Sequence, residues 1–566
     1  MKLRFLALAG PCEARTAWVR LAAAEFPPGL ARSHASHRFE LWTFPETPVV
    51  HSRAGDSILI GWAFDRVTGR RIDQAPSAKL RPEPILRDLV GGYALITERR
   101  AGHAILRDPS GAIVVYHRPE GACDVYASDG ELLWPGTSQA LSPDLEYIRH
   151  GLSYPYLRAA RTGCLGAREL LPGQCRTVDG DDTVEQAAWH PTGHGAAVTR
   201  FDEAAGCLRE ELLRSIPRMV PQHEPIVLKL SGGLDSSLVA GVMVRAGLPF
   251  ATINFATGDA EGDEREYARA VADACGIELH ELSTQTDALD LSLARVTLLR
   301  PPRHPLLQAL DRTYAKRFAA LGTAVIVDGA GGDNVFAYLN TAAPALDAWR
   351  CGGLAAVARA IGDLGDVHGG NLWNTAGFAW RKLRRGTSTR WPAVHDFLML
   401  GAIVAQPEPH PWLDVPQDVL PGMREHLRMI VGVRQFLPDP SPCMPAMVHP
   451  LLAQPIVELC LRIPTHLWIH GGRDRAVARA AATGLVPESN LARRGKGALG
   501  TMFRTQFRAL APQLGPFLCE GRLAEADIVD PAAITSYLED PNRWAGYQAM
   551  RLLEIAAAEQ WLRGFA

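Results

Sequence analysis

The first part of the chain has the short, interrupted apolar segments that are typical of β-strands. These segments are four to six residues long and are separated by Gly, Pro and Asp turn signals. They lie at residues 5–9, 57–62, 93–96, 112–116 and 123–128. The apolar stretch at 5–9 is too short for the core of a signal peptide and is followed at once by Pro11, so a first strand is the better interpretation. We expect a β-sandwich over residues 1–192.

After a short Gly/Pro loop at residues 190–195, the hydrophobic pattern changes to alternating strands and helices. Predicted strands are followed by predicted helices, an order that favours a doubly wound parallel sheet and an α/β fold class. The strands are expected at 226–230, 250–255, 277–282 and 324–328, and the helices at 236–245, 264–275, 288–299 and 306–320. The remainder of the chain has a helical, Ala/Leu/Arg-rich pattern, so the second domain is expected to span residues 200–566.

Composition narrows the function classes without choosing among them. The 566 residues carry 59 basic and 61 acidic side chains, a net charge of -2, which argues against a nucleic-acid partner. No apolar run approaches the roughly 20 residues of a membrane-spanning helix. The ten cysteines are scattered, without zinc-type pairs. Reduced thiols, and therefore a cytoplasmic location, are the simplest expectation.

The chemistry is concentrated in residues 231–237, with the sequence SGGLDSS, directly after an apolar strand and at the start of a helix. Two glycines allow the backbone to approach a phosphate, and the N–H groups at a helix start attract the anion. Asp235 would repel a phosphate unless a cation lay between them, which indicates a Mg²⁺ ligand. The Gly-Lys-Ser/Thr ending of a Walker loop is missing. A phosphate-binding loop is the favoured interpretation over a plain helix cap.

This segment resembles the PP-loop (SGGxDS) of ATP pyrophosphatases, and the layout of the whole chain resembles the asparagine synthetase B family. In that family a glutaminase-like (Ntn-type) domain precedes the synthetase domain. Residues 107–111 (RDPSG) and 171–173 (LPG) match first-domain motifs of the family, and residues 328–334 (DGAGGDN) match its SGxGxD loop. The resemblance implies ATP and Mg²⁺ as cofactors and an AMP-forming carbon–nitrogen ligase that activates a carboxylate as an acyl-adenylate.

The resemblance also assigns site residues in this sequence. Asp235 and Asp333 would hold Mg²⁺ between adjacent strand ends, and Lys496, with Arg494 beside it, would neutralise charge on the reacting oxygens. For Asp263 a family role and a helix cap remain equally open. The ATP and pyrophosphate site would comprise Leu230, Ser231, Gly232, Gly233, Asp235, Ser236, Ser237, Phe255, Gly329 and Gly331.

Two departures from the family pattern change the expected activity. Glutamine-using members begin Met-Cys, whereas this chain has Lys2, and Cys12 lies in the first strand region without a free α-amine. Glutaminase activity should therefore be absent. Ala330 stands where asparagine synthetases have Glu and β-lactam synthetases Tyr, so the site has room for a bulkier substrate.

The chain thus resembles most closely the lasso-peptide macrolactam synthetases, the lasso cyclases. The resemblance implies that an Asp or Glu side chain of a core peptide is adenylated and then joined to the peptide's N-terminal amine. A leader peptidase and a leader-binding protein are the implied partners. Small-molecule amide or β-lactam synthesis, and a ligase using free ammonia, remain alternatives. Glu458 and His449 are both candidates for the base that deprotonates the amine.

Overall fold

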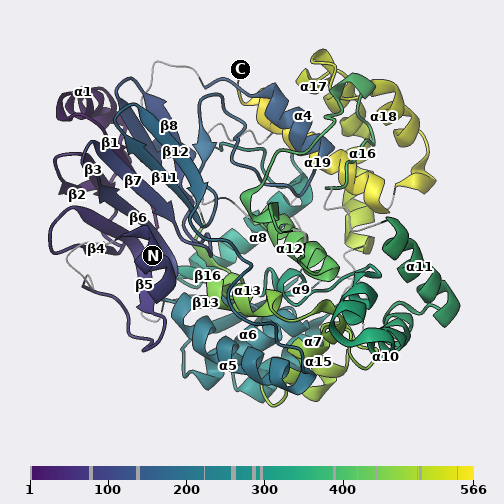
Figure 1. Cartoon of the computed structure of the whole chain (residues 1–566). Helices are drawn as coiled ribbons and strands as arrows, with labels where there is room; N and C mark the ends of the chain where they lie inside the picture. The colour runs from purple at the N-terminus through teal and green to yellow at the C-terminus, as the bar shows by residue number, and fades with distance from the viewer. Residues whose placement is uncertain are drawn as a thin grey trace.

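Two antiparallel six-stranded sheets pack face to face in the N-terminal part of the chain, at the left of Figure 1. Inward side chains of both sheets share one core cluster, including Phe5 and Leu41 from one sheet and Ile58, Ile96 and Ile105 from the other. In spatial order the first sheet contains β10 (Arg168–Glu169), β8 (Tyr116–Glu120), β9 (Cys123–Ala127), β1 (Phe5–Ala9), β3 (Phe39–Thr43) and β2 (Ala31–Ala35). The second contains β12 (Asp182–Ala187), β11 (Gln174–Asp179), β7 (Gly102–Arg107), β6 (Leu89–Glu98), β5 (Ser57–Asp65) and β4 (Val49–His51).

The computed structural model describes most of the chain. The described residues are 3–74, 81–135, 141–221, 224–256, 263–283, 289–292, 298–385, 391–416, 418–437, 439, 444–493, 495, 500–544 and 546–565. In the sandwich they include the short helices α1 (Cys12–Ala22), α2 (Pro82–Asp88), α3 (Gly130–Leu133) and α4 (Leu145–Ser153).

The predicted strand at 112–116 is wrong in its bounds, and so is the placement of Cys12. Residues 111–115 are irregular, and β8 begins only at Tyr116. The carbonyl of Ile113 accepts a hydrogen bond from Arg107 Nε at 2.6 Å, so a side chain takes the place of a ladder partner. Ile113 is nevertheless buried, which is why its apolar pattern resembled a strand. Cys12 begins α1 and is exposed, one turn beyond β1.

A five-stranded parallel sheet forms the centre of the second part of the chain, as the alternating pattern predicted. Its spatial order is β15 (Leu279–Ser283), β14 (Ala251–Ala256), β13 (Ile226–Lys229), β16 (Val325–Val327) and β17 (Ala446–Val448). Val227 lies opposite Ala251 on one side and Ile326 on the other. The chain builds outward from β13 to β15 and then returns to add β16 and β17 on the opposite side. Strand order therefore reverses between β13 and β16.

Helices alternate with the strands of this sheet. The predicted helices at 236–245, 264–275 and 306–320 are confirmed within two residues at each end by α6 (Leu234–Arg245), α7 (Arg265–Cys275) and α8 (Pro305–Ala320). In the predicted helix 288–299, residues 289–292 are not helical, and residues 288 and 293–297 lie outside the described part. Before and after the alternating region lie α5 (Phe201–Met219) and α9 (Gly332–Val335).

The rest of the chain is helical, as predicted, and α16 to α19 lie together at the upper right of Figure 1, beside α4. These helices share a core cluster with residues of the first sheet, such as Leu6 and Val125. None of the described helices is long and apolar enough to cross a bilayer. The helices are α10 (Ala343–His368), α11 (Leu372–Arg385), α12 (Pro421–Val433), α13 (Gln454–Leu461), α14 (Ala476–Ala481), α15 (Glu488–Ala492), α16 (Gly500–Cys519), α17 (Arg522–Glu525), α18 (Pro531–Leu538) and α19 (Gly546–Arg563).

Candidate active site

The two glycine-rich segments follow neighbouring strands at the point where strand order reverses. Residues 231–237 follow β13, and residues 328–334 follow β16, its direct neighbour. In open parallel sheets, ligands bind outside the carboxyl ends of the strands at such a reversal, because the flanking loops there diverge and leave a crevice. The topology therefore brings together the two segments that the sequence singled out.

The loop after β13 depends on glycine at one position and on internal hydrogen bonds elsewhere. Gly232 has φ +78°, and a Cβ there would lie 2.5 Å from the backbone nitrogen of Ala268, so a larger residue does not fit. Asn490 of α15 is buried, and its amide donates to the carbonyls of Gly232 at 2.9 Å and of Tyr267 at 3.0 Å. These contacts fix the conformation of the loop. The first N–H groups of α6, which follow the loop, have no partner within the helix and are available to a ligand.

The second loop packs directly against the start of α6. A Cβ at Gly329 would lie 2.6 Å from the backbone nitrogen of Ser236, and a Cβ at Gly332 would collide with the carboxyl group of Asp235. These glycines let the two loops approach each other. The Cβ position of Gly331, with φ +89°, instead faces Leu452 at 2.6 Å, so this glycine serves the turn into α9 and the packing behind it.

Asp235 and Asp333 converge on a single cation, the guanidinium of Arg475. Its Nη1 lies 3.2 Å from Oδ1 of Asp235 and 2.5 Å from Oδ1 of Asp333. Burial alone would lower the pKa of Arg475, but the neighbouring carboxylates of Asp235, Asp333 and Asp474 raise it. The guanidinium also lies over the ring of Tyr338, 5.4 Å from its centroid.

This geometry fits the predicted Mg²⁺ ligands. Both carboxylates already face one positive charge, and Mg²⁺ in nucleotide sites usually takes one or two carboxylates together with phosphate oxygens and waters. Among the described residues no group of three or more His, Cys, Asp or Glu side chains could hold a metal alone. The arrangement therefore suits a cation that arrives with a phosphate-bearing ligand, for which Asp235 and Asp333 would supply the protein oxygens. The sequence alone assigned no role to Arg475.

Asp328 and His449 form a half-buried pair at the ends of β16 and β17. His449 Nδ1 lies 2.8 Å from Oδ1 of Asp328. Burial alone would raise the pKa of Asp328, but His449 and Lys229 lower it, so the carboxylate is charged. In the tautomer whose Nδ1 donates to this carboxylate, Nε2 is the nitrogen that can accept a proton.

The other proposed base is held elsewhere. Glu458 accepts hydrogen bonds from Arg66 at 2.8 Å and from Trp189 Nε1 at 2.8 Å, in contact with the sandwich rather than with the loops. Of the two candidates that the sequence left open, the geometry favours His449. Asp263 forms an ion pair with Arg265 at 2.7 Å and accepts from that residue's backbone nitrogen, but the N-cap of α7 is Glu264, so Asp263 contacts the helix start without being its N-cap residue.

The remaining predicted residues have varied surroundings. Leu230 is buried, with its backbone bonded to Ile253 and Asn254 of β14, and Phe255 packs against Tyr314. Ser231 Oγ lies 3.1 Å from Ser236 Oγ. The Ser237 hydroxyl is buried and has no hydrogen-bond partner among the described residues. Lys496 and Arg494 lie outside the described residues, as does Lys2. The ligand roles of all these residues stay predictions.

A parallel sheet with glycine-rich loops at its reversal point is typical of α/β proteins that bind phosphate-bearing ligands. The chain belongs to the asparagine synthase family, whose model matches residues 207–439 and 446–563. This membership supports the predicted family resemblance and a ligase of the ATP-dependent, amide-forming type.

Two curated fungal proteins are similar over a limited region. "Amidase chry2" of Gibberella zeae is 28% identical over 192 residues, which are 30% of this chain and 28% of the relative. "Amidase chyE" of Penicillium rubens is 25% identical over 199 residues, 31% of this chain and 30% of the relative. The chain thus spans less than a third of the length of these curated relatives.

Two solved structures show a distant similarity to the chain. NMN synthetase from Francisella tularensis is 18% identical, with a TM-score of 0.17, and the match covers 25% of this chain and 59% of that one. The glutamine phosphoribosylpyrophosphate amidotransferase from B. subtilis is 9% identical, with a TM-score of 0.22 and coverage of 58% and 90%. Scores this low do not establish a common overall fold.

Proposed function

We propose that this protein is an ATP-dependent lasso peptide cyclase, which closes an isopeptide macrolactam within a core peptide. The observation that carries the proposal is the convergence of Asp235 and Asp333 at the reversal point of the parallel sheet, with the Asp328–His449 pair at the ends of β16 and β17 in the same sheet. Groups suited to carboxylate activation and a group suited to accepting a proton from an amine thus follow neighbouring strands. Membership of the asparagine synthase family supports the same reaction class.

In the first proposed step, an Asp or Glu side-chain carboxylate of the peptide attacks the α-phosphorus of ATP. An oxygen–phosphorus bond forms, pyrophosphate leaves, and an acyl-adenylate results. The loop at 231–237 and the start of α6 would position the departing pyrophosphate through backbone N–H groups. Mg²⁺ bound by Asp235 and Asp333 would offset the phosphate charge. Lys496 and Arg494 are proposed to stabilise the negative charge that develops on the reacting oxygens.

In the second proposed step, the peptide's N-terminal amine attacks the activated carbonyl carbon, and AMP leaves. The amine must lose a proton as the new carbon–nitrogen bond forms. His449 Nε2 would accept that proton, while Asp328 holds Nδ1 and stabilises the charged ring. His449 also lines the large cavity between the two parts of the chain, which is where a peptide could reach it.

One feature of the second loop favours an internal amine over ammonia. Ala330 lies in the second loop, half-buried, with its backbone nitrogen bonded to Asp328 at 3.0 Å, and its methyl group leaves space where other members carry Glu or Tyr. A leader peptidase and a leader-binding protein are the proposed partners, because a core peptide must be released before its amine can react.

The test is to incubate the purified protein with ATP, Mg²⁺ and linear core peptides that have an Asp or Glu at ring-forming distance. The proposal predicts AMP and a product lighter by one water. AMP formed with small amino acids or with ammonia, but never with peptides, would favour the alternative ligases instead. The variant His449→Gln should still support carboxylate-dependent exchange of pyrophosphate into ATP but lose ring closure by about 100-fold or more. Glu458→Gln is the matched control and should retain both activities.

A further inference from the structure

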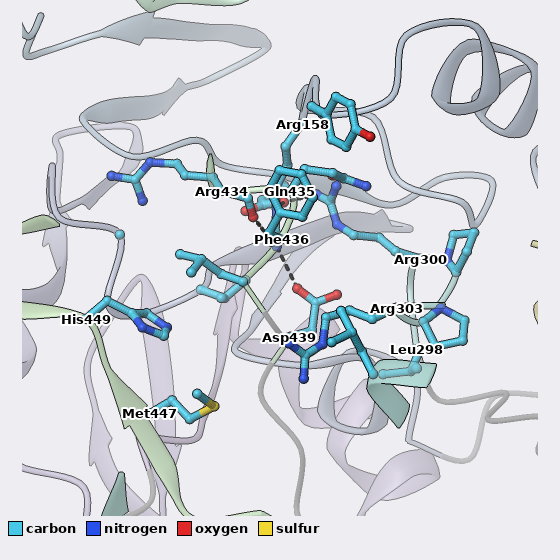
Figure 2. A pocket seen from close by; sticks show the side chains of 18 of the residues that line it. Arg158, Leu298, Arg300, Arg303, Arg434, Gln435, Phe436, Asp439, Met447 and His449 are labelled. Atoms are coloured by element: carbon cyan, nitrogen blue, oxygen red, sulfur yellow. Dashed lines mark hydrogen bonds and ion pairs between the residues drawn. The ribbon is translucent and has the colours of Figure 1, made fainter. Parts of the chain in front are cut away.

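A cavity of about 470 Å³ lies between the β-sandwich and the parallel sheet. Its walls include residues 110–114 from the first part of the chain and residues 444–447, which lead into and begin β17. Figure 2 shows His449 and Met447 on one side and several arginines on the other. The cavity also touches Leu452, the residue that packs against Gly331, so its wall is the back of the second glycine-rich loop.

Four buried arginines line this cavity. Each is at least nine-tenths buried, and the four are Arg107, Arg158, Arg300 and Arg434. Burial, together with repulsion from neighbouring arginines, lowers the pKa of both Arg107 and Arg434 to about 9. Neighbouring positive charges that are buried away from water are stable only with negative partners.

Fewer carboxylates than guanidiniums lie in this group. Glu169 pairs with Arg107 at 2.7 Å and with Arg158 at 2.9 Å, and Asp439 pairs with Arg158 at 2.7 Å. The third is Asp108, whose pKa burial raises to about 6. Arg434 instead donates to the carbonyls of Ser110 at 2.9 Å and Pro109 at 3.1 Å. Among these described residues, four cations therefore face three acids.

Arg300 has more buried N–H groups without a hydrogen-bond partner than the other three arginines, although Nε of Arg434 also lacks one among the described residues, and Asp439 and Tyr116 lie within electrostatic reach of Arg300. It forms an ion pair with Glu169, a carboxylate already shared by Arg107 and Arg158. Its Nε and Nη1 atoms are buried and have no hydrogen-bond partner among the described residues. Leaving charged N–H groups buried and unsatisfied is costly, and a carboxylate is the group that best matches the planar fork of a guanidinium.

We infer that the interdomain cavity is a binding site for a carboxylate, held chiefly by Arg300. The ligand would be a carboxylate of the substrate other than the one that is activated, and in a peptide this is the C-terminal carboxylate. Apolar lining residues such as Leu298, Phe436 and Met447 would contact the side chains next to it. The anion site stands on the geometry alone; the identification of its ligand as the substrate rests on the proposed function.

The test is a binding measurement that needs neither ATP nor turnover. The probe is 4-fluorohippurate, an aromatic acylglycine that presents a C-terminal carboxylate, and its neutral match is 4-fluorohippuramide. Binding to the full-length protein is followed by fluorine NMR. We expect the wild type to bind the carboxylate at least about ten-fold more tightly than the amide, as a charge-assisted pair implies. Equal binding of the two probes, or no binding in the millimolar range, would overturn the inference.

Variants locate the site. Arg300→Met should weaken binding of 4-fluorohippurate by about ten-fold or more, and Arg300→Lys should restore part of the loss. Arg303→Met is the control, because Arg303 lines the same cavity but is already paired with Asp311, and it should change the affinity by less than about two-fold. An unchanged affinity in Arg300→Met would overturn the assignment. If that variant does not fold, the comparison of the two probes on the wild type decides. Failure of peptide cyclisation would leave this binding result intact, so the two proposals fail separately.

Discussion

Replacing Arg475 with methionine should make the ATP-free protein bind divalent cations more tightly. In the structure, one guanidinium nitrogen of Arg475 lies between Asp235 and Asp333, where we expect the metal ion to bind. A cation and this side chain therefore compete for the same two carboxylates. Methionine keeps the unbranched shape of the side chain but removes the charge.

The size of the effect follows from the two ion pairs. At an effective dielectric constant of about 20, unit charges roughly 4 Å apart attract each other by about 4 kcal/mol. The pair with Asp333 must be discounted to about 1 kcal/mol, because 36% of that side chain is exposed and solvent screens it. The pair with Asp235, whose side chain is 11% exposed, contributes about 1.5–3 kcal/mol. Removing both should increase cation affinity by at least about ten-fold.

Mn²⁺ titration, followed by the electron paramagnetic resonance of the free ion, measures this affinity directly. Arg473→Met is the control, because Arg473 is exposed and contacts only the carbonyl of Leu491 among the described residues. Asp235→Asn should reduce binding in either background. If Arg475→Met binds Mn²⁺ no more tightly than the wild type, the two carboxylates do not form the metal site.

Three further predictions concern the loops and the core. Gly332→Ala should lower ATP-dependent release of pyrophosphate by about 100-fold, because the new methyl group collides with Asp235. Gly206→Ala, in open space on α5, is the control and should leave the rate unchanged. Equal rates in the two variants would refute the close packing of the loops. Asn490→Ala should lower the free energy of unfolding by about 1–3 kcal/mol and raise the KM for ATP, because the carbonyls of Gly232 and Tyr267 lose their donor. An unchanged KM would contradict the role of Asn490 in fixing the loop. Burial lowers the pKa of His426 to about 4, below its unfolded value of about 6.5, so its contribution to stability is present above pH 6.5 and is lost as the pH falls toward 4, by up to about 1.4 kcal/mol per pH unit. The Tm should therefore fall between pH 6.5 and 4.5, and a flat profile would contradict this.

Much of the fold could be predicted because its signals are local. The strands at 226–230 and 250–255 are continuous apolar segments that lead into glycine-rich or helical stretches, and β13 and β14 confirm them. The fifth strand, β17, has only three residues and follows β16 after more than 100 residues of mostly helical chain, so no local pattern could reveal it. The segment at 112–116 was misassigned because burial and strand pairing produce the same apolar pattern.

In the candidate site, too, local features could be predicted from the sequence and long-range contacts could not. Residues 231–237 combine loop, helix start and carboxylate in one segment, so their chemistry can be recognised from the sequence. The contact between Arg475 and Asp235 joins residues 240 positions apart, and the Asp328–His449 pair joins residues 121 apart. Such contacts depend on the order of the strands in the sheet, which local sequence patterns do not reveal. The arginine group around Arg300 is hidden for the same reason, because its members come from both parts of the chain.

The central claim is that the protein activates a carboxylate by attack on the α-phosphorus of ATP. The most direct measurement uses a linear core peptide labelled with ¹⁸O in both oxygens of the acidic side chain, followed by mass spectrometry of all products. We expect one labelled oxygen in AMP and the other in the new amide carbonyl. Label in inorganic phosphate, with formation of ADP, or unlabelled AMP, would contradict the claim.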